Sequence, residues 1–166
     1  SMRIIGIDPG TGILGFGVIE VQHGRAKLVT AGVIRTPAHT PLPDRLKEIY
    51  DSLTEIIEET EPTVMAIEKL FFARNVTTAM SVSHARGVAM LTGKQAGLTI
   101  EEYTPLQIKQ SLTGYGKADK KQVQEMVKII LKLEKIPTPD DAADAIAVAI
   151  CHGHSYKLND SLREKR

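Results

Sequence analysis

The first 35 residues of the chain contain three runs rich in apolar side chains, which cover residues 3–9, 13–21 and 27–35. In the third run, Val29, Ala31 and Val33 alternate with their neighbours, and a period of two is typical of β-strands. The Pro-Gly-Thr-Gly sequence of residues 9–12 suits a tight turn between the first two runs. The pattern predicts an antiparallel meander of three strands, with the first strand at the centre of a larger sheet.

Farther along the chain, helical periods alternate with short apolar runs. Leu42, Leu46, Ile49 and Leu53 follow the period of an amphipathic helix, which Pro62 closes. Two more strands are expected at residues 63–67 and 98–103, and further helices at residues 75–95, 105–112, 120–133 and 140–156. This order of elements predicts an α/β fold, in which a mixed five-stranded sheet carries helices on both faces.

The bulk composition is that of a one-domain protein. The chain has 166 residues, and we expect a single domain over residues 1–156 followed by a polar, disordered tail at residues 157–166. The lone Cys151 cannot form an internal disulfide and suits a reducing compartment. We find no secretory signal and no apolar run of membrane-spanning length, so we expect a cytoplasmic protein without a membrane partner.

The formal net charge of +1 hides an uneven distribution. Residues 41–68 contain two basic and eight acidic side chains, whereas residues 69–135 contain eleven basic and five acidic ones. A basic face is the electrostatic footprint of a polyanionic ligand such as nucleic acid. Two solvated helix surfaces would give the same counts, so charge alone does not decide between the two interpretations.

Four acidic residues lie next to apolar segments. Asp8 and Glu68 end two predicted apolar strands, and Asp141 and Asp144 lie at the start of the last, largely apolar helix. A carboxylate at the edge of a core is costly unless a cation accompanies it, and Mg²⁺ takes oxygen ligands. Two metal ions held by such acids can promote an in-line displacement at phosphorus. The acids therefore predict an enzyme that cleaves phosphodiester bonds.

Three of these acids also have a structural explanation. Asp8 precedes Pro-Gly and could simply form a turn, and Glu68 could pair with Lys69 or a nearby Arg. Asp141 fits a capping-box pattern at the start of a helix, where the helix dipole favours an acid. Asp144 lies three residues later on the same face, among alanines that allow close packing, and has no such explanation.

At these acids the chain resembles the RuvC family of Holliday junction resolvases. The resemblance implies a ribonuclease H-like fold of the retroviral integrase superfamily, and catalytic and metal-binding roles for the four acids. It also implies a homodimer that cuts four-way DNA junctions with two Mg²⁺ ions per site, which Mn²⁺ could replace, and coupling to the RuvAB branch-migration complex. The stretches that carry it are Ile5-Gly6-Ile7-Asp8-Pro9-Gly10-Thr11-Gly12, Ala66-Ile67-Glu68-Lys69-Leu70-Phe71-Phe72-Ala73-Arg74-Asn75, Ala85-Arg86-Gly87-Val88 and Asp140-Asp141-Ala142-Ala143-Asp144-Ala145.

The resemblance further places DNA-binding positions in the basic half of the chain. Phe71 matches a position that stacks on unpaired bases, although a core position would also explain it. Lys109 and Lys120 match basic positions of the family. The remaining candidates for phosphate contacts are Lys117 and Lys121, which follow or flank the Gly114-Tyr115-Gly116 loop, and Arg74 and Arg86.

The apolar side chains of the expected helix at residues 75–95 cover a wider surface than packing against one face of the sheet requires. We interpret the excess as a two-fold dimer seam at which Ala85 and Gly87 permit close approach, while a deeply buried helix is the alternative. The five histidines show no metal-ligand spacing, and His152 alone is a weak candidate for a supporting role behind the metal ligands.

Three other functions stay open at this point. The chain also resembles shorter resolvase-like nucleases that act on RNA. A protein that binds junctions without cutting them would need the same basic surface. The turn after Asp8 also resembles the phosphate turn of actin-like kinases and chaperones, although those proteins have two lobes and much longer chains.

Overall fold

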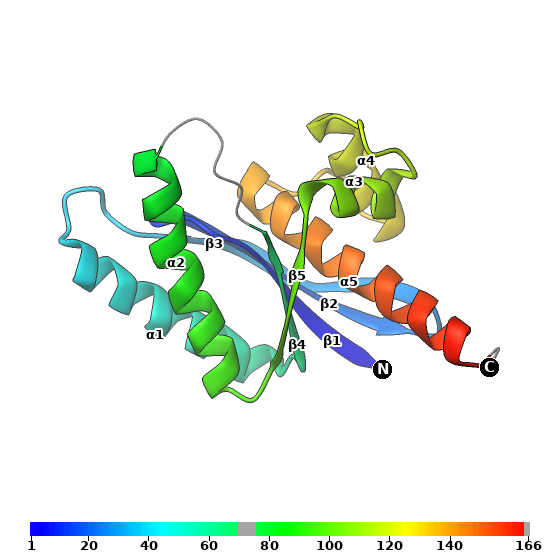
Figure 1. Ribbon diagram of the computed structural model, residues 1–166, viewed down its shortest axis with the longest axis horizontal. Coiled ribbons are helices and arrows are strands. Elements are labelled where there is room, and N and C mark those ends of the chain that lie inside the picture. The colour runs from blue at the N-terminus through cyan, green and yellow to red at the C-terminus, as the bar shows by residue number, and fades with distance from the viewer. Residues whose placement is uncertain (70–75, 165–166) are drawn as a thin grey trace.

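The computed structural model describes residues 1–69 and 76–164, with side chains throughout except at residues 76–78 and 157–164. Its five strands form one mixed sheet of order β3-β2-β1-β4-β5 (Figure 1). β1, β2 and β3 are the predicted antiparallel meander, and β4 and β5 continue the sheet in parallel with β1, which is central as expected. The strands span Met2–Asp8 (β1), Ile13–Gln22 (β2), Arg25–Arg35 (β3), Val64–Glu68 (β4) and Thr99–Tyr103 (β5).

Helices cover both faces of the sheet, so the predicted α/β architecture is confirmed. α1 (Leu42–Thr60) and α2 (Val76–Gln95) lie on one face, and α5 (Asp140–Glu164) crosses the other, with α3 (Pro105–Thr113) and α4 (Lys120–Ile130) packed against it (Figure 1). α5 continues past Tyr156, the predicted end of the last helix.

Each face of the sheet has its own core, because successive side chains of a strand point to opposite faces. On β1, Ile4 packs towards α5 while Ile5 and Ile7 pack towards α1 and α2, and all three are fully buried. Ala85 of α2 is also fully buried in this second core. The expectation that Ala85 lies at an exposed seam is therefore wrong, because the helix turns that side chain towards the sheet.

Two glycines allow α5 to lie unusually close to the sheet. A Cβ atom on Gly6 of β1 would overlap the carbonyl oxygen of Ala145, and one on Gly15 of β2 would overlap the carbonyl oxygen of Asp141. The helix contributes Ala142 and Ala145 to this contact, both almost completely buried. This close packing brings the first two turns of α5, with Asp141 and Asp144, down to the end of β1.

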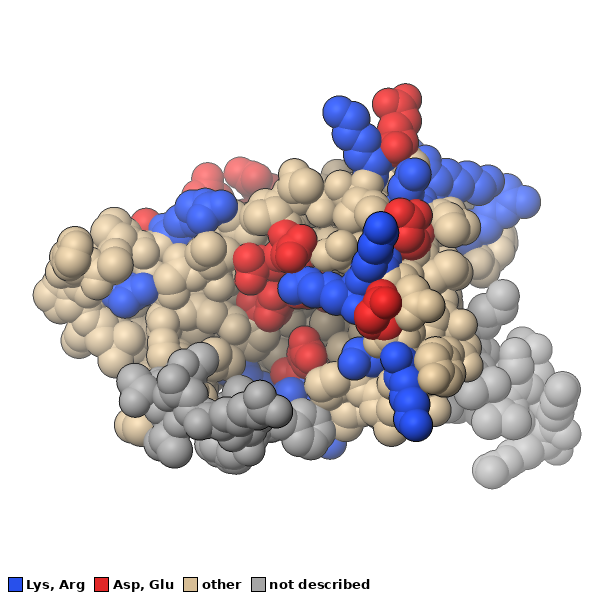
Figure 2. Space-filling model, turned by 90° about the horizontal axis from the view of Figure 1, so that it is seen from above, with Lys and Arg blue, Asp and Glu red and all other residues tan. Residues whose placement is uncertain are grey.

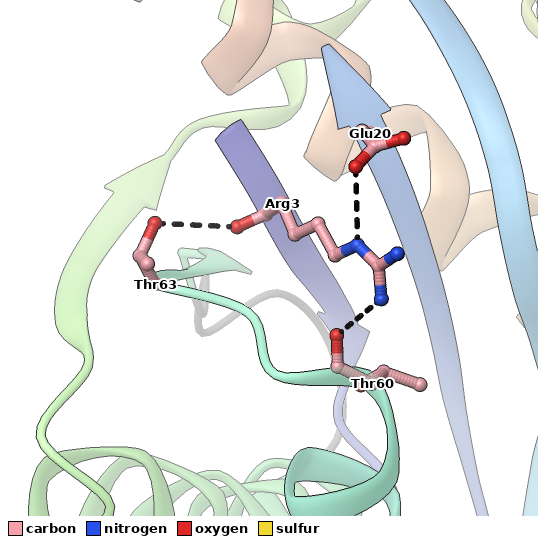
Figure 3. A network of polar contacts seen from close by, with 4 residues as sticks. All are labelled: Arg3, Glu20, Thr60 and Thr63. Atoms are coloured by element: carbon pink, nitrogen blue, oxygen red, sulfur yellow. Dashed lines mark hydrogen bonds and ion pairs between the residues drawn. The ribbon is translucent and has the colours of Figure 1, made fainter. Parts of the chain in front are cut away.

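A polar network joins the opposite end of β1 to its neighbours (Figure 3). The Arg3 guanidinium forms an ion pair with Glu20 of β2 at 3.3 Å and donates a hydrogen bond to the carbonyl oxygen of Thr60 at 2.8 Å. The backbone N–H of Thr63 donates to the Arg3 carbonyl at 3.0 Å. Because these contacts fix the entry to β4 beside β1, the two strands leave the sheet at the same edge.

Candidate active site

The sheet topology brings the four predicted acids to one edge. β1 and β4 are parallel neighbours with Ile7 opposite Ile67, so Asp8 and Glu68 follow side by side at the ends of their strands. Asp141 and Asp144 lie on the first turns of α5, which begins at this edge. Figure 2 shows acidic side chains gathered in a hollow of this surface, with basic side chains reaching over it.

Asp8 is the electrostatic centre of the cluster. Burial raises the pKa of Asp8 to about 8, and the charges of Asp144, Glu68 and Asp141 act in the same direction. Asp141 raises the pKa of Asp8 through its charge and also as a hydrogen-bond partner of the protonated side chain. Several carboxylates in one partly buried place cannot all ionise cheaply, so Asp8 keeps its proton to a higher pH than an exposed Asp does.

Glu68 and Asp144 extend the cluster towards the basic half of the chain. Burial and the neighbouring Asp144 raise the pKa of Glu68, whereas Lys109 and Lys120 lower it. Among the described residues, no basic side chain forms an ion pair with the Glu68 carboxylate. The structural explanation of Glu68 as half of a pair is therefore wrong for Lys69 and Arg86, and Arg74 lies outside the described residues.

Lys120 at the start of α4 supplies the main counter-charge of Asp144. Its ammonium group lies 3.3 Å from Asp144 and 3.5 Å from Asp140. Burial raises the pKa of Asp144, and Lys120 opposes that shift. Asp140 also accepts a hydrogen bond from Gln124 of α4 at 3.1 Å. Sequence reasoning missed Asp140, because its partners lie far away in the chain and follow no helical or strand spacing.

The acids have the chemistry of a divalent-cation site, although they do not form a closed one here. Across residues 1–69 and 76–164, no three carboxylate, imidazole or thiol groups lie close enough together to hold one metal ion as they stand. The donors are nevertheless carboxylate oxygens carrying partly buried negative charge, which suits a hard cation such as Mg²⁺. The assignment of the four acids as metal ligands thus stays a prediction.

Two hollows meet at Glu68. One is lined by Glu68, Pro105, Lys109, Lys120 and Asp144, among others. The second runs to the other side of Glu68 and is lined by Asp8, Pro9, Glu68, Lys69, Val82, Arg86 and Pro105. Lys109 and Lys120 therefore border the acids directly, and Lys69 lines the second hollow beside Asp8 and Glu68.

The other predicted DNA-binding residues are more scattered. Phe71 and Arg74 lie outside the described residues. Lys117 is exposed in the loop after α3, and Lys121 borders a separate hollow with Asp119 and Gln122. Neither lines the two hollows at Glu68. Figure 2 shows that basic side chains nevertheless continue outward from the acidic cluster over this face.

Arg86 has a different environment from the lysines. Its side chain is 17% exposed and pairs with Glu102 of β5 at 3.1 Å. It also donates to the backbone carbonyl of Glu68 at 3.4 Å and reaches the sulfur of Met90 at 3.4 Å. Contact with DNA phosphate stays a prediction for Arg86, and the observed partners are all within the protein.

His152 does not support the acids in this structure. It is buried, and its Nδ1 atom lies 2.6 Å from the Tyr103 hydroxyl, in hydrogen-bond contact. Burial lowers the pKa of His152, with Glu101 opposing the shift. His154 likewise contacts the Ser111 hydroxyl at 2.9 Å. Both histidines thus tie α5 to its neighbours, in agreement with the structural interpretation.

A central strand ending in Asp, a parallel neighbour ending in Glu and a crossing helix that begins with Asp define a ribonuclease H-like fold. Residues 4–152 match the family "Crossover junction endodeoxyribonuclease RuvC". The chain belongs to this RuvC family, as its sequence motifs indicated. Endodeoxyribonucleases are hydrolases of phosphodiester bonds, so the predicted enzyme class is confirmed.

Relatives that bear this family name align along nearly the whole chain. The Desulfitobacterium hafniense protein is 54% identical over 157 residues, which is 95% of this chain and 95% of the relative. The Alkaliphilus metalliredigens protein is 55% identical over 164 residues, which is 99% of this chain and 100% of the relative. Family membership therefore rests on full-length similarity rather than on a few motifs.

Solved structures agree with the fold. RuvC of Thermus thermophilus in complex with Holliday junction substrate has a TM-score of 0.92 and 34% identity, with 96% of this chain and 97% of that chain covered. The yeast mitochondrial Holliday junction resolvase has a TM-score of 0.73 at 14% identity, covering 98% of this chain and 82% of that one. The second comparison supports the fold alone.

Within the part of the chain that is described, no helix combines the length and apolar character needed to cross a membrane.

Proposed function

We propose that this protein is a structure-selective endonuclease that resolves four-way DNA junctions by paired, symmetric nicks. The observation that carries the proposal is the acidic cluster of Asp8, Glu68, Asp141 and Asp144 at the edge of a RuvC-family fold. The Thermus thermophilus relative in complex with Holliday junction substrate supports the choice of DNA. Residues 69–135, with their excess of basic side chains, provide the electrostatic attraction for a polyanion.

The chain's own side chains would divide the work of hydrolysis between two groups. The four acids would hold two Mg²⁺ ions, or Mn²⁺ in their place, which when bound supply Lewis-acid stabilisation and an activated water. Lys109 and Lys120, which border the acids, would hold the phosphate next to the scissile bond. The products would be a 5′-phosphate and a 3′-hydroxyl, which DNA ligase can reseal.

A synthetic four-way junction and a linear duplex with the same arm sequence test this function. With Mg²⁺, we expect paired nicks in two opposed strands of the junction and no cutting of the duplex. The nicked products should be resealed by ligase. Tight binding to the junction without any nick would favour a junction-binding protein instead, and cleavage of an RNA substrate in preference to DNA would favour the resolvase-like RNA nucleases.

The exposed face of α2 supports a homodimer. Met80 and Leu91 are 56% and 55% exposed, and Gly87 lies between them on the same helix face with nothing near its missing Cβ. The exposed His84 lies on the same face, and a face of this mixed kind can pair with its own copy about a two-fold axis. A two-fold dimer carries two active sites, which suits opposed cuts in a nearly two-fold symmetric junction.

Leu91→Asp is expected to weaken the dimer at least tenfold, because a carboxylate would be buried near its own copy. Analytical ultracentrifugation over a concentration series measures the change. Ile129→Asp is the matched control, since Ile129 is 61% exposed on α4 and should leave association unchanged. An unaltered dimer in Leu91→Asp, or equal loss in both variants, would exclude the α2 face as the seam.

The remaining partner and location are those of a DNA-processing enzyme of the bacterial cell. Coupling to the RuvAB branch-migration complex would deliver the junction to the cutting site. A cytoplasmic location is consistent with the buried, unpaired Cys151. An actin-like phosphate-transfer function is not proposed, because the family match covers residues 4–152, including the turn on which that alternative rested.

A further inference from the structure

Arg86 joins three elements at the place where Glu68 leaves the sheet. It projects from α2, pairs with Glu102 of β5 and donates to the backbone carbonyl of Glu68 at the end of β4. Its third guanidinium nitrogen lies 3.4 Å from the sulfur of Met90, one turn along α2. The planar guanidinium thus uses all three nitrogens on internal partners, a geometry that the single ammonium of lysine cannot reproduce.

The end of β4 shows why these contacts of Arg86 matter for Glu68. β4 and β5 stay in register up to Glu68 and Tyr103, where the backbone N–H of Lys69 donates to the Tyr103 carbonyl at 2.7 Å. Glu68 is the last residue of β4. The direction of the Glu68 side chain therefore depends on how firmly the last peptide of β4 is held, and the Arg86 contact is made to this peptide.

The charge of Arg86 is already neutralised. Its partner Glu102 lies 3.1 Å away, with 35% of its side chain exposed. Burial and Asp144 raise the pKa of Glu68, and the basic residues that lower it are Lys109 and Lys120 rather than Arg86. Arg86 lines the hollow that contains Asp8 and Glu68, yet its positive charge is directed to Glu102 and its hydrogen bond to the backbone.

We propose that Arg86 is a positioning residue for Glu68, and that the Arg86–Glu102 pair clamps the end of β4 rather than gripping DNA phosphate. The inference rests on the proposed function, since it concerns the same acidic site. A misplacement of a reacting group by about 1 Å can reduce a rate on the order of 10²-fold. Loosening the clamp should therefore slow the cutting step and leave DNA affinity nearly unchanged.

Three variants of the full-length protein separate a clamp from a phosphate ligand: Arg86→Lys, Arg86→Gln and Glu102→Gln. For a clamp, all three should lower the single-turnover cutting rate, roughly 10- to 100-fold for the Arg86 variants and less for Glu102→Gln. All three should also raise the Mg²⁺ concentration needed for half-maximal rate. Junction affinity and its salt dependence, measured without metal, should stay within about threefold of wild type.

The two roles make opposite predictions for two of these variants. If Arg86 gripped phosphate, Arg86→Lys would preserve much of its function, and Glu102→Gln would strengthen DNA binding by freeing a positive charge. Lys117→Gln is the matched control for a phosphate contact, because Lys117 is exposed in the loop between α3 and α4. We expect it to weaken binding and to reduce the slope of log affinity against log salt by about one.

Hydrogen exchange of the free protein tests the clamp independently of cutting. The backbone amides of residues 66–69 should exchange faster in Arg86→Lys than in wild type, while the β1–β2 ladder stays protected. Unchanged exchange together with a full cutting rate, or weakened binding with a full rate at saturating DNA, would overturn the clamp. Failure of the wild-type protein to cut junctions would instead overturn the proposed function, and the exchange result would still decide the role of Arg86.

Discussion

Asp8→Asn and Glu68→Gln are each expected to abolish junction cutting, with a loss of at least about 10³-fold in single-turnover rate. Each change replaces one carboxyl group by an amide of nearly the same shape at the edge where β1 and β4 end. Junction binding should persist, because neither change removes a basic side chain or adds negative charge to a surface that faces a polyanion. Cleavage of a labelled junction and a gel-shift titration on the same preparations measure both effects.

Asp140→Asn provides the matched control for these variants. Asp140 directly precedes Asp141 and shares Lys120 with Asp144, yet its side chain is 66% exposed. We expect the cutting rate of Asp140→Asn to stay within about tenfold of wild type, because an exposed ion pair such as Asp140–Lys120 contributes little free energy to the structure of the site. Equal loss in all three variants would show that the site responds to total charge rather than to particular ligands. Full cutting by Asp8→Asn or Glu68→Gln would exclude that residue from catalysis.

The sequence predicted the fold well because its strongest signals are local. Short apolar runs joined by turn residues marked the strands of the meander, and the continuous apolar run before Glu68 marked a strand buried on both faces, which is β4. The meeting of Asp8 and Glu68 followed from strand direction, since parallel neighbours end at one edge. The small residues at the start of α5 indicated close packing, and Gly6 and Gly15 opposite them complete it.

What the sequence could not predict depends on partners that are distant in the chain. Lys120 pairs with Asp140 and Asp144, and Arg86 pairs with Glu102, although no periodic spacing connects these residues. Charge counts alone place Arg86 among the phosphate-binding candidates, whereas the structure gives it internal partners. Helix ends were also imprecise, because the polar face of α5 continues beyond Tyr156 without a breaking residue.

Asp8→Asn is also expected to stabilise the metal-free protein at pH 8, by at least about 2 kcal/mol in the free energy of unfolding. The folded-state pKa of Asp8 is raised from 3.8 to about 8, chiefly by burial and then by its acidic neighbours. The native state therefore holds a proton that the unfolded state releases between these values. Wild-type stability should fall as pH rises from about 4 to 8 relative to the variant, which has no such proton to lose.

Urea unfolding in EDTA at pH 5, 6, 7 and 8 measures this difference, which should shrink steadily towards low pH. Glu59→Gln on the exposed side of α1 is the control and should shift stability by less than about 0.5 kcal/mol at every pH. Adding Mg²⁺ should raise the wild-type midpoint more than that of Asp8→Asn, because a ligand that binds only the native state stabilises it. A gain that is independent of pH would show that Asp8 is not the group carrying the raised pKa. An equal response of both proteins to Mg²⁺ would show that the ion binds elsewhere. An ion held by the Asp8 carboxylate must stabilise the wild type more than a variant that lacks this carboxylate.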